Sequence, residues 1–91
     1  MSDVLSQELE IKNIRGLHAR AAAAFVKTAE NFDAEVEVER LGQQVSGHSI
    51  MGLMMLAAAK GTTIKVSVSG NQAQAALDAI AALVNNKFGE D

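Results

Sequence analysis

The stretch Gly16-Leu17-His18-Ala19-Arg20-Ala21-Ala22 marks the point at which a strand pattern ends and a helical pattern begins. Before it, residues 7–12 alternate apolar Leu9 and Ile11 with polar side chains, which is typical of a half-buried strand. After it, residues 19–31 are rich in alanine, the strongest helix former, and their apolar side chains recur at helical spacing. The stretch therefore predicts a strand, a sharp turn and a helix in succession.

The same two periodicities divide the rest of the chain. Residues 34–39 alternate so regularly, as Ala-Glu-Val-Glu-Val-Glu, that one face of a strand must be apolar and the other covered with carboxylates. Leu41-Gly42 is typical of a hairpin turn. The further predicted elements are a short strand at 43–46, a short helix at 50–56, a strand at 62–69 and a helix at 72–85. The order β-α-β-β-α-β-α, with one apolar face on each element, predicts an α+β open-faced two-layer sandwich whose helices cover one side of a four-stranded sheet.

Length and composition limit the function classes. A chain of 91 residues with 48% hydrophobic side chains predicts a single domain over residues 1–91. There is no cysteine for a disulfide or thiolate site, and two histidines cannot complete a zinc site, so we expect no metal and no cofactor. The chain starts without a secretory signal pattern and has no membrane-length apolar segment, so we expect a cytoplasmic protein that does not insert into membranes. A net charge of −3 and 3% aromatic residues argue against nucleic acid as a partner.

The charges are segregated along the chain. Residues 11–29 carry four basic side chains and no acidic one, and residues 40–77 also lack acidic side chains. The carboxylates gather between residues 8 and 10, between residues 30 and 39, and at the C-terminal end. This distribution predicts an acidic face and a neutral-to-basic face, with His18 on the second.

His18 is the candidate reactive residue. Gly16 permits the positive φ of a sharp turn, and a residue at the mouth of the helix lies beside N–H groups that have no intrahelical acceptor. We expect His18 to cap the helix, with one ring nitrogen free to attack phosphorus. The phosphoryl group would then meet the Arg20 guanidinium and the backbone of Gly16, Ala19 and Arg20. The alternative is that His18 is only a polar capping residue.

Three motifs together resemble one family. They are Gly16-Leu17-His18-Ala19-Arg20, the segment Ser49-Ile50-Met51-Gly52, and Ala58, Lys60 and Gly61 ahead of the last strand. With the β-α-β-β-α-β-α order, nearly the whole chain resembles the HPr family, the histidine-containing phosphocarriers of the bacterial phosphoenolpyruvate-dependent phosphotransferase system. The resemblance leaves open whether the chain serves the sugar branch or the nitrogen-related (NPr) branch.

The resemblance implies an antiparallel sheet of order 1-4-2-3 with three helices on one face. It also implies that His18 accepts a phosphoryl group on Nδ1 from Enzyme I and passes it to an Enzyme IIA domain, assisted by Arg20. The protein would then be a monomeric, stoichiometric carrier and not an enzyme. One position departs from the family pattern, because Ala21 stands where proline is usual. Alanine keeps the helix and restores an N–H group near the phosphate, so we expect the transfer to survive with a looser helix start.

A second group of residues is expected to dock partners. Methionine adapts to partners of different shape, so we predict that Met51 and Met54 form an exposed apolar patch with basic Lys27 at its edge. The remaining predicted docking residues are Leu17 and Ile50, while Leu53 and Leu56 are expected in the core.

Ser49 has two compatible readings. It is a candidate helix N-cap, and the resemblance makes it a phosphorylation site of an HPr kinase/phosphorylase in some family members. A phosphate there would weaken docking of an acidic partner to the neighbouring patch. His48 is expected to be a solvated loop residue. The alternative functions are a regulatory docking module controlled through Ser49, with His18 transfer secondary, and a small ligand-binding sandwich without covalent chemistry.

Overall fold

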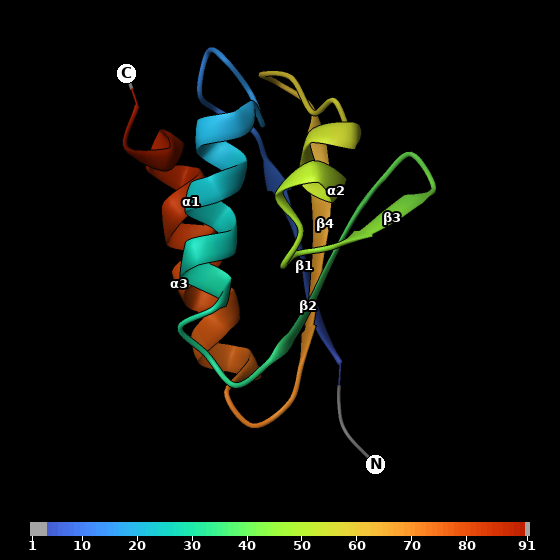
Figure 1. Cartoon of the computed structure of the whole chain (residues 1–91), viewed down its shortest axis with the longest axis vertical. Helices are drawn as coiled ribbons and strands as arrows, with labels where there is room; N and C mark the ends of the chain where they lie inside the picture. The colour runs from blue at the N-terminus through green and yellow to red at the C-terminus, as the bar shows by residue number, and fades with distance from the viewer. Residues whose placement is uncertain (1–3, 91) are drawn as a thin grey trace.

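The computed structural model describes residues 4–90 and forms two layers, with the helices on one face of a four-stranded sheet (Figure 1). The elements are β1 (Leu5–Glu10), α1 (Ala19–Ala29), β2 (Glu35–Arg40), β3 (Gln43–Ser46), α2 (Ile50–Met55), β4 (Thr63–Ser69), α3 (Ala73–Asn85) and a 3₁₀ turn, η1 (Lys87–Gly89). All strand pairs are antiparallel, in the order β1-β4-β2-β3. The predicted fold class, sheet order and helix placement are confirmed.

The core follows from the alternation in the strands. Val38 of β2 pairs with Val66 of the central strand β4, and both side chains are fully buried beneath the helices. Phe25 of α1 and Ile80 of α3 are also fully buried, so the two long helices cover the core on the side opposite the sheet. Burial of apolar surface at these positions is the main stabilisation of the fold.

The opposite face of the sheet carries the carboxylates. Lys65 of β4 pairs with Glu8 of β1 on one side and with Glu39 of β2 on the other. Glu35 and Glu37 of β2 are exposed on the same face by the alternation of the strand. The acidic face therefore lies away from the helices.

The observed bounds of the helices and strands lie close to those predicted from the sequence, except at β1 and at the turn η1. β1 begins and ends two residues earlier than predicted, because Ile11 leaves the ladder and bonds instead to the loop before β4. Its N–H donates to the Thr62 carbonyl at 2.8 Å, and its carbonyl accepts from the Gly61 N–H at 2.8 Å. The turn η1 was not predicted. In it Lys87 and Phe88 both adopt left-handed backbone, with φ of 57° and 55°.

No helix within residues 4–90 is long and apolar enough to cross a membrane. The start of the chain, in which no signal pattern was predicted, lies partly outside the described residues, as do both ends of the predicted domain over residues 1–91.

Candidate functional site

A tight turn between β1 and α1 presents His18. The Gly16 N–H donates to the Asn13 carbonyl at 3.2 Å, and the Asn13 amide nitrogen donates back to the Gly16 carbonyl at 2.7 Å. Gly16 has a φ of 66°, and a Cβ there would lie 2.5 Å from the Ala58 carbonyl oxygen. The next residue, Leu17, donates its N–H to that same oxygen at 2.9 Å. Only glycine fits this close approach of two loops.

His18 occupies the N-cap position of α1. Its backbone is extended, and its carbonyl accepts the first helical hydrogen bond, from the Ala22 N–H at 2.8 Å. His18 therefore caps the helix as expected, but through its backbone alone, because the imidazole makes no cap hydrogen bond. The ring is instead turned toward the C-terminal end of the chain and remains 21% exposed.

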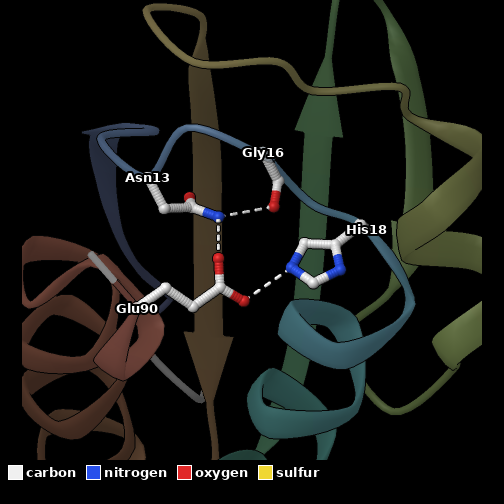
Figure 2. A network of polar contacts seen from close by, with 4 residues as sticks. All are labelled: Asn13, Gly16, His18 and Glu90. Atoms are coloured by element: carbon white, nitrogen blue, oxygen red, sulfur yellow. Dashed lines mark hydrogen bonds and ion pairs between the residues drawn. The ribbon is translucent and has the colours of Figure 1, made fainter.

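The partner of the ring is Glu90 (Figure 2). Glu90 Oε2 lies 2.5 Å from His18 Nε2, and Glu90 Oε1 accepts a hydrogen bond from the Asn13 amide at 3.0 Å. Figure 2 shows the second ring nitrogen of His18 pointing away from Glu90. Desolvation raises the pKa of the Glu90 carboxyl. The hydrogen bonds from Asn13 and His18, together with the charges of His18 and Arg15, lower that pKa by more than desolvation raises it. The pKa of Glu90 therefore lies below its ordinary value. Glu90 is therefore a carboxylate at neutral pH.

Two arginines flank this network. Arg15 and Arg20 are exposed and, with Ile14, Gly89 and Glu90, line an open cavity of about 500 Å³. A smaller hollow, which Arg15 also lines, is formed by His18 and residues 57–59. The surroundings of His18 were predicted to be neutral to basic, and the two arginines agree with this, while folding adds the single carboxylate of Glu90.

The predicted docking residues fall into two groups. Ile50, Met51 and Met54 are exposed on α2, at 41%, 73% and 43%, and Met55 joins them at 64%. We call these four residues the methionine patch. Lys27 is exposed in the last turn of α1, the helix against which α2 packs.

Leu17 does not belong to this surface. It is 4% exposed and packs in the core cluster, so the prediction that it docks partners is withdrawn. Leu53 and Leu56 are buried as expected. The misassignment arose because Leu17 stands in a turn, where local periodicity gives no inward direction.

Ser49 and His48 lie at the start of α2. Ser49 is the N-cap, and its hydroxyl oxygen accepts a hydrogen bond from the Gly52 N–H at 2.9 Å. His48 is half-buried in the preceding loop, where its N–H donates to the Ser46 hydroxyl at 3.0 Å.

Comparison with known proteins identifies the family. A family model described as the phosphorylation site of the HPr component of the phosphotransferase system matches residues 5–86. The chain belongs to the HPr family of phosphocarrier proteins. One HPr relative, the phosphocarrier protein HPr of Neisseria meningitidis, is 49% identical over 87 residues, which cover 96% of this chain and 98% of the relative. The phosphocarrier protein NPr of Shewanella violacea is 44% identical over 86 residues and 94% of both chains.

The HPr fold extends to solved structures. The crystal structure of HPr-C-His from Thermoanaerobacter tengcongensis matches with a TM-score of 0.91 and 41% identity, covering 96% of this chain and 98% of that one. The resemblance stated from the sequence motifs is thereby confirmed.

Three residues near these surfaces were missed by the sequence analysis. Asn13 and Glu90 are separated by 77 positions, so no local pattern connects them. Met55 follows directly on Met54 and could have been included, since a six-residue helix cannot turn every apolar side chain toward one sheet.

Proposed function

We propose that this protein is a phosphocarrier of the phosphotransferase system that accepts a phosphoryl group on His18 from phosphorylated Enzyme I and passes it to an Enzyme IIA domain. The observation that carries the proposal is an accessible imidazole at the mouth of α1 with one ring nitrogen turned away from its carboxylate partner. Family membership supports the same role.

The proposed transfer needs few groups from this chain. The Nδ1 lone pair attacks phosphorus, the new Nδ1–P bond forms, and the bond between phosphorus and the group of Enzyme I that carried it breaks. The Arg20 guanidinium and the N–H groups of Ala19 and Arg20 then face the phosphoryl oxygens, because the first turn of a helix has no intrahelical acceptors for its N–H groups. The second transfer repeats these steps toward Enzyme IIA.

Gly16 has a different part in this proposal from the one its sequence position suggested. Its N–H already donates to Asn13, so it supplies the turn and not a phosphate ligand. Ala21 is buried in the first turn, and the helix begins at Ala19 without a proline.

We further propose a carrier used stoichiometrically, without turnover as an enzyme, acting as a cytoplasmic monomer with one domain over residues 1–91. Enzyme I and Enzyme IIA would dock on the methionine patch, with Lys27 meeting acidic groups of the partner.

The test is phosphorylation by phosphoenolpyruvate and Enzyme I. We expect an acid-labile phosphate on the wild type that is lost in His18→Ala and retained in His48→Ala, the matched control with the other histidine of the chain. Absence of labelling on the wild type, or equal labelling of His18→Ala, would contradict the proposal.

A second candidate function is regulation through Ser49, possible because this hydroxyl caps the helix that carries the methionine patch. A phosphate there places negative charge beside the patch and weakens docking of an acidic partner. Incubation with an HPr kinase/phosphorylase and ATP should label the wild type and not Ser49→Ala. In a pull-down with Enzyme I, Ser49→Asp should bind less than Ser49→Ala, and equal binding would count against regulation.

A further inference from the structure

The carboxylate beside His18 is delivered by an unusual chain end. After α3, Lys87, Phe88 and Gly89 take positive φ values of 57°, 55° and 77° in succession, a conformation that L side chains rarely adopt. Phe88 is 8% exposed and packs in the core cluster, which fixes the turn. The Glu90 N–H donates to the Lys87 carbonyl at 2.9 Å, so the residue that reaches His18 is itself held by the turn. Figure 1 shows this end of the chain beside the start of α1.

The other side of the carboxylate is held by a buried amide. Asn13 is fully buried, and its two amide hydrogens are both used, one on the Gly16 carbonyl and one on Glu90 Oε1. Asn13 thus ties Glu90 to the same turn that presents His18. The ring is connected to both chain segments through a single carboxylate group.

This arrangement determines where the ring proton lies. An ionised carboxylate only accepts hydrogen bonds, so the contact between Glu90 Oε2 and His18 Nε2 requires the proton to be on Nε2. A neutral imidazole carries one N–H, which leaves the lone pair on Nδ1. A hydrogen bond at one ring nitrogen in this way sets the tautomer of the imidazole and the direction in which the other nitrogen points.

The geometry points to Glu90 as a positioning residue that holds His18 in the Nε2–H tautomer and directs the Nδ1 lone pair toward the incoming phosphorus. This inference rests on the function proposed above. During the transfer the Nδ1–P bond forms and the bond between phosphorus and the donor group of Enzyme I breaks, while the Nε2 proton stays on the ring. Glu90 balances the positive charge that the ring acquires as the new bond forms.

The variant that tests this role is Glu90→Gln, which keeps the shape of the side chain and removes its charge. Glu30→Gln is the matched control, because Glu30 is an exposed glutamate at the far end of α1. Nitrogen-15 spectra of the ring, recorded at alkaline pH where imidazole is neutral, should show Nε2–H in the wild type and in Glu30→Gln. In Glu90→Gln the Nδ1–H fraction should rise, because the amide NH₂ can donate to Nε2.

Phosphoryl transfer supplies the second readout. The rate from phosphorylated Enzyme I should fall about tenfold in Glu90→Gln, by analogy with the lower end of the loss when a group that orients a metal-binding histidine is removed. The rate should be unchanged in Glu30→Gln. An unchanged tautomer in Glu90→Gln would overturn the inference, and so would a changed tautomer with an unchanged rate. Failure of the proposed function gives a different result, since the wild type would then carry no phosphate on His18 while the ring spectra still report on Glu90.

Discussion

The proposed transfer site around His18 and the methionine patch on α2 are two surfaces that the chain builds in opposite ways. The patch comes from one continuous segment, residues 50–55, exposed on a helix of six residues. The site around His18 combines residues 13–20, the loop at 57–59 and the chain end at 87–90. One is local and adaptable, and the other is held by contacts across most of the chain.

This difference fits two physical demands. In the proposed transfer, the imidazole must attack phosphorus along a defined direction, so it needs a fixed orientation. A surface that meets partners of different shape gains from flexible thioether side chains that can repack. Substitutions at the two surfaces should therefore fail differently, the first through the fold and the second through docking.

The largest effect is expected from Gly16→Ala. The added Cβ would lie 2.5 Å from the Ala58 carbonyl oxygen, and the alanine would have to keep the backbone φ of 66°. We therefore expect a loss of about 3 kcal/mol in the free energy of unfolding. Gly61→Ala is the matched control, since Gly61 also has a positive φ but a Cβ there meets no atom within 4 Å. Strain alone should cost it about 1 kcal/mol. Equal losses in urea unfolding would show that the loop contact does not fix the site.

A smaller effect, confined to docking, is expected from Met51→Glu. Met51 is 73% exposed, so the free energy of unfolding should change by about 0.5 kcal/mol or less, while transfer from Enzyme I should slow about tenfold. Leu41→Glu introduces the same charge at an apolar side chain that is 87% exposed on the β2–β3 hairpin, outside the patch. If both variants slowed transfer equally, net charge and not the patch would be responsible.

The fold could be predicted from the sequence because its signals are local. Alternation in residues 34–39 gave β2 within one residue, and the alanine-rich run after His18 gave the start of α1. The end of β1 was misplaced because Ile11 continues the alternation while its hydrogen bonds go to a loop. Residue type alone cannot reveal such a change of partner.

The site was predictable only in its local half. The sequence indicated the sharp turn at Gly16, the helix start and the exposure of Arg20. The sequence pattern groups Glu90 with the acidic residues at the C-terminal end of the chain. It gives no sign that Glu90 contacts His18, because a separation of 72 positions carries no periodic signal that links the two residues. The left-handed backbone at Phe88 is also not favoured by its residue type, and it arises because burial of the ring outweighs the strain.

The smallest effect concerns the pH dependence of stability at the chain end. Because the pKa of Glu90 is lowered on folding, the unfolded chain binds more protons near that pKa, and stability rises with pH through this range. The contribution of Glu90 should be complete above the ordinary carboxyl pKa of about 4.3 and lost as pH falls through the lower folded pKa. The stability difference between wild type and Glu90→Gln, measured by urea unfolding, should therefore shrink on acidification. The contributions of the other carboxylates are the same in both proteins and cancel in this difference.

The control Glu30→Gln should lose no stability at neutral pH, because the carboxylate of Glu30 lies near the negative end of α1. A difference for Glu90→Gln that stayed constant from neutral to acidic pH would mean that the contact with His18 and Asn13 does not depend on the charge, and the distinction between a fixed site and an adaptable patch would then rest on packing alone.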